Sequence, residues 1–189
     1  MKEIELDKWQ REVLNTKGNI CLCSGRQVGK STVISIRAGE YAVNNRNNIK
    51  TGKDRPTKHT LKLKNGSTIH CLPAGESGYG IRGYTIDQLY ADEAAFIPEE
   101  VWTAVTPMLA TTGGEIVLLS TPHGTNNYFY RCSKDPKFAQ FRLSSENSDH
   151  IPKDFLADEK KRMSQRQYAQ EYLGHFLEDL MQFFADNTI

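Results

Sequence analysis

Residues 24–32 read SGRQVGKST, a segment rich in small and polar residues that contains two glycines and a lysine. It follows a short apolar run, Ile20 to Cys23, and precedes a segment with helical spacing that extends to about Asn44. A glycine-bearing loop between a buried strand and the start of a helix offers successive backbone N–H groups to an anion, and the helix dipole favours negative charge there. The stretch therefore predicts a phosphate-binding loop.

The chemistry of nucleotide phosphates assigns roles to this loop. Lys30 is expected to reach the β- and γ-phosphates of ATP, and the Ser31 hydroxyl to ligate Mg²⁺. The sequence departs from the usual pattern G-x-x-x-x-G-K-[ST], because Ser24 replaces the first glycine and Gly25 stands beside it. The nucleotide contacts expected of the loop come from Gly25, Arg26, Gln27, Val28, Gly29, Lys30, Ser31 and Thr32.

A second apolar run, residues 89–91, ends in two carboxylates. The carboxyl ends of parallel strands lie together at one edge of the sheet, beside the same crevice. Asp92 is therefore expected to bind the Mg²⁺ ion through its coordination shell, and Glu93 to polarise the attacking water. The alternative for such an acidic pair is a helix cap. A third run, residues 115–119, ends in Ser120 and Thr121, which either sense the γ-phosphate or cap a turn.

The remaining pattern indicates an α/β fold. Apolar strands alternate with helical segments, which predicts a helix-covered, mainly parallel sheet. Residues 61–70, LKLKNGSTIH, alternate on both sides of Asn65-Gly66 and predict a β-hairpin with a type I′ turn. Helices are expected over residues 5–16, from about Pro98, and as one long helix over 152–176.

Length, composition and charge limit the classes of protein to which the chain could belong. At 189 residues the chain suits one domain, and no apolar run approaches the ~18–20 residues of a membrane span. No signal peptide is evident, so we expect a cytoplasmic protein with four buried, reduced cysteines. The net charge of +1 gives no argument for nucleic acid, but residues 46–64 hold seven basic residues and one acid. That stretch either tracks phosphates or forms a solvated loop.

In their order along the chain, these motifs resemble the ATPase domain of viral terminase large subunits, a helicase-like, additional-strand branch of the P-loop NTPases. Residues 6–10, LDKWQ, resemble its adenine-recognition element, which would make Gln10 the reader of the adenine edge. The phosphate loop, with its Arg-Gln pair, is similar to the family's deviant one. The other matching segments are 81–84 with 89–96, 118–124 and 168–176.

The resemblance implies an ATP-hydrolysing motor that drives double-stranded DNA into a capsid in the host cytoplasm. The implied partners are the capsid portal, the small terminase subunit and further copies of the chain in a ring, with no membrane. It places the 115–120 strand between the other two, and hence Ser120 and Thr121 between Lys30 and Glu93. Arg82 matches an arginine presented to the neighbouring subunit, and Arg26 could act within its own site. Alternatively, Arg82 pairs with Asp87 or a DNA phosphate.

Two departures qualify the resemblance. A large subunit continues into a nuclease, whereas here we expect an ATPase domain over residues 1–176, a tail or linker over 177–189 and no nuclease activity. The family also has a strand and helix after the phosphate-loop helix, yet residues 44–60 contain nothing resembling a buried strand. Two other functions stay open: a fragment of a superfamily-two helicase-like translocase, which would use Gln10, Lys30, Asp92 and Glu93 in the same roles, and a non-hydrolysing nucleotide-binding assembly module.

Overall fold

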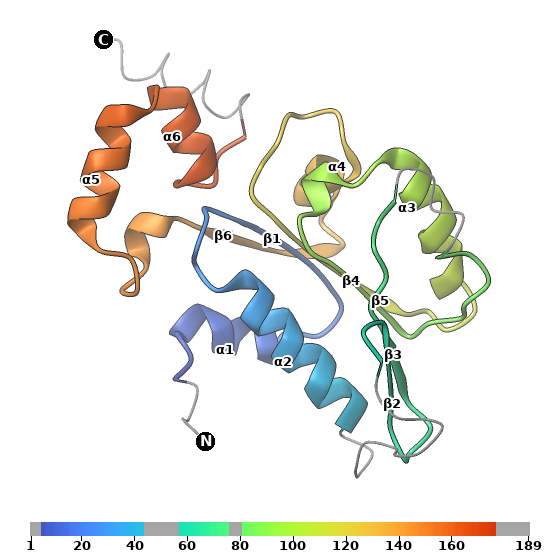
Figure 1. The fold of residues 1–189 in the computed structure, drawn as a ribbon. Helices are drawn as coiled ribbons and strands as arrows, with labels where there is room; N and C mark the ends of the chain where they lie inside the picture. The colour runs from blue at the N-terminus through green and yellow to red at the C-terminus, as the bar shows by residue number, and fades with distance from the viewer. Residues whose placement is uncertain (1–4, 44–56, 76–80, 177–189) are drawn as a thin grey trace.

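The computed structural model describes residues 5–43, 57–75 and 81–176. Its centre is a parallel four-stranded sheet with the order β4-β5-β1-β6 (Figure 1). The strands are β1 (Asn19–Ser24), β4 (Gln88–Ala91), β5 (Glu115–Ser120) and β6 (Phe138–Leu143). Because β5 lies between β1 and β4, the additional-strand order is confirmed, as is the α/β class with a mainly parallel sheet.

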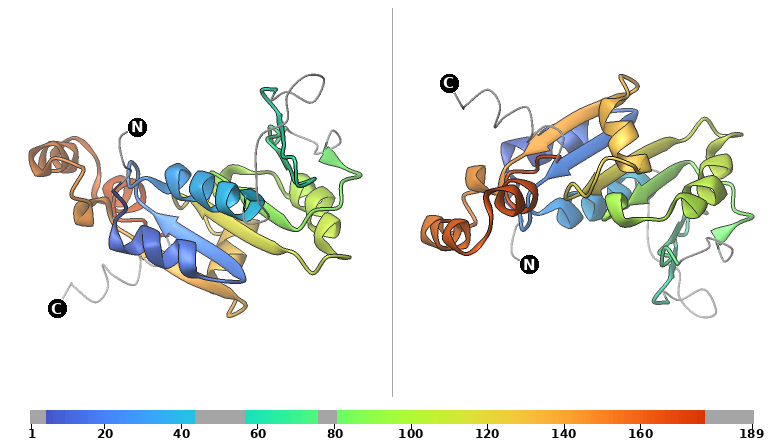
Figure 2. Two further views of the ribbon diagram at one scale, coloured as in Figure 1. Left: turned by 90° about the horizontal axis from the view of Figure 1, so that it is seen from below. Right: turned by 90° about the horizontal axis from the view of Figure 1, so that it is seen from above.

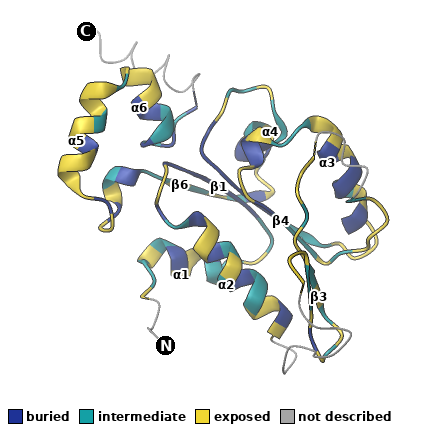
Figure 3. Ribbon diagram, viewed as in Figure 1, coloured by how far each residue is buried: buried dark blue, intermediate teal, exposed yellow. Residues whose placement is uncertain are grey.

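Helices cover both faces of the sheet. Successive side chains of β1 point to opposite faces, so the strand packs against helices on each side. Ile20 and Leu22 pack against α1 (Lys8–Asn15) and α2 (Lys30–Val43). Cys21 and Cys23 point to the other face, which is covered by α3 (Glu99–Val105) and α4 (Tyr128–Lys134). β1 is buried from Ile20 to Ser24 (Figure 3), as expected for a central strand of a sheet with two covered faces.

The predicted hairpin is confirmed, but its turn differs. β2 (Thr60–Lys62) pairs antiparallel with β3 (Thr68–His70). Of Asn65 and Gly66, only Gly66 has a positive φ, +95°, whereas a type I′ turn needs positive φ at both central residues. Asn65 is held differently because its side chain accepts from Ser67 N at 2.9 Å and donates to Ala42 O at 2.9 Å.

The prediction of one helix over residues 152–176 is wrong. The structure has α5 (Lys153–Arg162) and α6 (Gln165–Glu171), separated by an extended Met163. Ser164 begins α6 with a capping box, in which its side chain accepts from Gln167 N and the Gln167 side chain accepts from Ser164 N. This reciprocal pair starts a new helix.

Several smaller features complete the description. Three short 3₁₀ helices lie next to strands in the chain: η3 (Ala94–Phe96) after β4, η4 (Thr106–Leu109) before β5 and η5 (Ser145–Asn147) after β6. Cys21, Cys23 and Cys132 are buried thiols, but Cys71 is exposed, contrary to expectation, because it follows β3 in the projecting hairpin. Among the described residues, no helix is long and apolar enough to cross a membrane. A strand-helix unit is expected to be missing near residues 44–60, of which residues 44–56 lie outside the described residues. The expected tail, residues 177–189, also lies outside them.

Candidate nucleotide-binding and catalytic site

The phosphate loop joins β1 to α2, and its backbone takes conformations that most residues avoid. Gly29 has φ +88° and Gln27 has φ +61°, both in the left-handed region. A Cβ atom at Gly25 would lie 2.2 Å from Ser145 Oγ and 2.2 Å from Tyr172 O, so only glycine fits there. The glycine beside Ser24 therefore permits the segments around residues 145 and 172 to pack on the loop.

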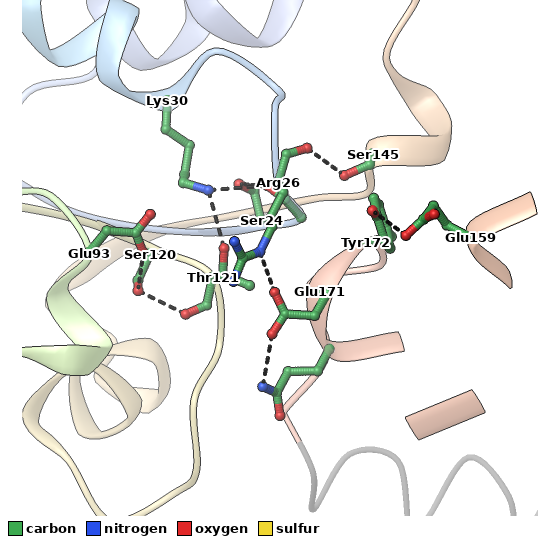
Figure 4. Close-up of polar contacts among 12 residues, drawn as sticks. Ser24, Arg26, Lys30, Glu93, Ser120, Thr121, Ser145, Glu159, Glu171 and Tyr172 are labelled. Atoms are coloured by element: carbon green, nitrogen blue, oxygen red, sulfur yellow. Dashed lines mark hydrogen bonds and ion pairs between the residues drawn. The ribbon is translucent and has the colours of Figure 1, made fainter. Parts of the chain in front are cut away.

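Lys30 opens α2 and points back across the loop (Figure 4). Its ammonium group donates to Gly25 O at 3.1 Å and to Thr121 Oγ1 at 3.4 Å. Burial lowers the pKa of Lys30, and the carboxylates of Glu93 and Asp92 partly offset that effect. A buried cation held by neutral oxygens is poorly compensated, which suits it to receive the oxygens of a phosphate.

The structure brings the predicted metal residues together. Ser31 Oγ donates to Asp92 Oδ2 at 2.6 Å, which joins the start of α2 to the end of β4. Hydroxyl and carboxylate oxygens are hard ligands of the kind that Mg²⁺ takes alongside water and substrate phosphates. Within the described ranges, no cluster of three or more His, Cys, Asp or Glu residues could hold a metal by itself. This donor pair thus fits an ion that shares its shell with a nucleotide.

Glu93 follows Asp92 and has a left-handed backbone, φ 50° and ψ 42°. Its Oε2 lies 3.4 Å from the buried hydroxyl of Ser120, which also accepts from Ala95 N at 3.2 Å. Ser120 in turn lies beside Thr121, whose side chain contacts Lys30. A non-glycine residue in this region is strained, and such strain is common where a side chain must be aimed at a reacting group.

Gln10 has a structural role in addition to its expected one. Its Oε1 accepts from Asp7 N at 2.9 Å and so caps α1, while its buried side chain reaches the phosphate loop. The Nε2 atom lies 2.9 Å from the position of a Cβ on Gly29. The side chain thus spans the start of α1 and the loop, close to where a nucleotide would sit.

Arg26 turns toward α6. Its guanidinium pairs with the Glu171 carboxylate, and Arg26 N donates to Glu171 O at 2.9 Å (Figure 4). The hydrogen bond to Glu171 raises the pKa of Arg26. Ser145 Oγ also donates to Arg26 O at 2.7 Å. Sequence reasoning missed Glu171 and Ser145, because they lie 145 and 119 positions from Arg26 and no spacing pattern connects them.

Arg82 precedes β4 in the chain, and its side chain is exposed. Tyr84, two residues later, packs on His70 of the hairpin with ring centroids 4.7 Å apart. Tyr84 therefore lies against the hairpin, while Ile81, directly before Arg82, packs against the core cluster that contains Cys23 and Ala91.

Comparisons with known proteins agree on one family. The family model of the terminase large subunit, T4likevirus-type, N-terminal, matches residues 45–189. The terminase large subunits of Thermus phage G20c and Thermus virus P23-45 are each 45% identical over 51 residues, which is 26% of this chain and 10% of theirs. The matched stretch is thus about a tenth of these relatives' length.

Solved structures extend the likeness across the fold. The large terminase ATPase domain of Thermus phage P74-26 superposes with a TM-score of 0.76 at 20% identity, covering 92% of this chain and 94% of that one. The large terminase of a second thermophilic bacteriophage gives a TM-score of 0.73 at 15% identity, covering 92% of this chain and 54% of that one.

The family model begins after the phosphate loop, so the geometry of residues 24–32 is an observation separate from that match. The family match and the structural likeness agree. The chain belongs to the terminase large subunit family and has the fold of a terminase ATPase domain.

Proposed function

We propose that this chain hydrolyses ATP to drive double-stranded DNA into a viral capsid. One observation carries the proposal: Lys30 and Glu93 both reach the end of β5, where Thr121 Oγ1 lies 3.4 Å from Lys30 Nζ and Ser120 Oγ lies 3.4 Å from Glu93 Oε2. A phosphate-binding cation and an acid that can accept a proton from water are thereby held by two adjacent residues. A site that only bound nucleotide would have no use for the aimed carboxylate of Glu93.

The reaction transfers the γ-phosphoryl group of ATP to water. Backbone N–H groups of residues 25–32 and the Lys30 ammonium hold the phosphates. Ser31 and Asp92 would hold Mg²⁺, which when bound neutralises charge on the β- and γ-phosphates. Glu93, steadied by Ser120, takes a proton from the attacking water as the bond to the leaving ADP oxygen breaks. ADP and inorganic phosphate result.

The wider assignment follows from family membership. The substrate that is moved would be double-stranded DNA, and the partners would be the capsid portal, the small terminase subunit and further copies of this chain in a ring. The ATPase domain would cover residues 1–176, with residues 177–189 as a tail or linker. Assembly would take place in the host cytoplasm.

Replacing Lys30 with alanine should lower phosphate release by at least about 10²-fold, because a preorganised donor on the transferring group is removed. Phosphate release with Mg²⁺, with and without duplex DNA, measures this effect. Lys17→Ala, which removes an exposed lysine near β1, is the matched control and should hydrolyse at the wild-type rate. A wild-type protein that binds ATP but releases no phosphate under either condition would favour the non-hydrolysing module.

Gln10→Ala should reduce the preference for ATP over GTP about tenfold, since an unpaired buried polar group costs about 1–3 kcal/mol. The kcat/KM ratio for the two nucleotides is the measurement. Gln10→Glu separates the two roles, because it retains the acceptor that caps α1 and removes the amide donor. Both variants should lose preference, while only Gln10→Ala removes the acceptor that caps α1. Unchanged preference in Gln10→Glu would leave Gln10 as a helix cap.

A further inference from the structure

We propose that the β2–β3 hairpin is a docking surface for the phosphate backbone of double-stranded DNA. This inference rests on the proposed function, because it names the surface by which the ATPase would hold the DNA it moves. The surface consists of the exposed polar side chains of the hairpin and of the turn that leads into it: Lys58, His59, Lys62, Lys64, Thr68 and His70.

Positive charge is concentrated on this element. Residues 57–75 contain three lysines, Lys58, Lys62 and Lys64, and no aspartate or glutamate. All three lysines are exposed. The whole chain carries a net charge of only +1, so the hairpin is more positively charged than the rest of the chain taken together. A cationic surface without carboxylates of its own attracts a polyanion and gains from releasing that polyanion's counterions.

The two faces of the hairpin differ in chemistry. Leu61 pairs with Ile69, and both are half-buried, whereas Lys62 pairs with Thr68, and both are exposed. The outward face thus offers ammonium and hydroxyl groups. Protein–protein interfaces are poor in lysine and rich in aromatic residues at their centres, while phosphate contacts come from Lys, Ser, Thr and similar groups. DNA is therefore a better match than an acidic protein.

The hairpin is fixed to the ATPase core, so a force that bound DNA exerts on the hairpin can reach the nucleotide site. Asn65 in its turn donates to Ala42 O in the last turn of α2, and Leu63 is buried. Lys30 begins α2 at the phosphate loop, and the 14 residues of this helix make it about 20 Å long. Both views of Figure 2 show the hairpin projecting from the sheet. The proposed DNA surface and the nucleotide site thus lie at opposite ends of one helix.

The test is the salt dependence of DNA binding by the full chain. Affinity for a fluorescein-labelled duplex is measured by anisotropy over a series of KCl concentrations, for wild type and for the triple variant K58Q/K62Q/K64Q. The slope of log K against log[KCl] should fall in magnitude by about 0.9 for each lysine–phosphate pair that the substitutions remove, and so by up to about 2.7. ATP hydrolysis without DNA, measured on the same preparations, should be unchanged.

Two further variants make the test specific. K160Q/K161Q/R162Q removes three exposed cations of α5 that pair with carboxylates of Glu146, Asp158 and Glu159, and it should keep the wild-type slope. K58R/K62R/K64R keeps the charge and should also keep the slope. A wild-type slope in K58Q/K62Q/K64Q overturns the inference while leaving the ATPase proposal intact. Absence of ATP hydrolysis by the wild type would instead refute the proposed function.

Discussion

Arg82→Ala should lower ATP turnover by the assembled protein about 10³- to 10⁵-fold, the range typical of a missing arginine finger. Phosphoryl transfer spreads negative charge over the γ-phosphate oxygens, and a guanidinium placed there stabilises it. Within one chain, Arg26 is held by Glu171. In the resemblance to terminase large subunits, Arg82 matches an arginine presented to the neighbouring subunit. We therefore expect Arg82 to act on a neighbouring subunit's site. Steady-state phosphate release measures the loss, and Arg162→Ala on α5 is the control.

A mixing experiment tests the action between subunits. Arg82→Ala and Glu93→Ala should each be inactive alone, yet a mixture should recover some hydrolysis, because one of the mixed interfaces joins an intact arginine to an intact site. A mixture of Lys30→Ala with Glu93→Ala, which both damage the same site, should recover none. Wild-type activity should rise more than linearly with protein concentration. If co-assembled Arg82→Ala and Glu93→Ala stay inactive, Arg26 becomes the candidate finger.

Local signals in the sequence were sufficient for the core of the fold. The apolar runs that end in Ser24, Ala91 and Ser120 predict β1, β4 and β5 because a buried parallel strand needs apolar residues on both faces. Their polar endings predict which residues gather in the crevice, and the contacts from Lys30 to Thr121 and from Ser31 to Asp92 follow that expectation. Strand order, in contrast, came from the family resemblance, since no periodicity encodes it.

The misses have separate physical causes. The break between α5 and α6 had a signal, because Ser164-Gln165-Arg166-Gln167 fits the S-x-x-Q capping box. The turn of the hairpin could not be predicted, since Asn65 leaves the type I′ conformation to bond with α2. The ion pair of Arg26 with Glu171 joins residues far apart in sequence, and only the packing of α6 on the phosphate loop reveals it.

Glu93→Gln should keep ATP binding and lose about 10²- to 10⁴-fold in turnover, the usual contribution of a positioned proton acceptor. The amide has the size of the carboxylate and can still contact Ser120, but it does not take a proton from water. Glu100→Gln, an exposed acid in the first turn of α3, is the matched control and should behave as wild type.

The role of Glu93 as proton acceptor is tested by two measurements on one preparation of Glu93→Gln: Kd for a fluorescent ATP analogue, and the rate of phosphate release at saturating ATP with Mg²⁺ and duplex DNA. We expect a Kd close to that of the wild type together with the loss of turnover. Hydrolysis at the wild-type rate would show instead that the Glu93 carboxylate beside Ser120 is not the proton acceptor.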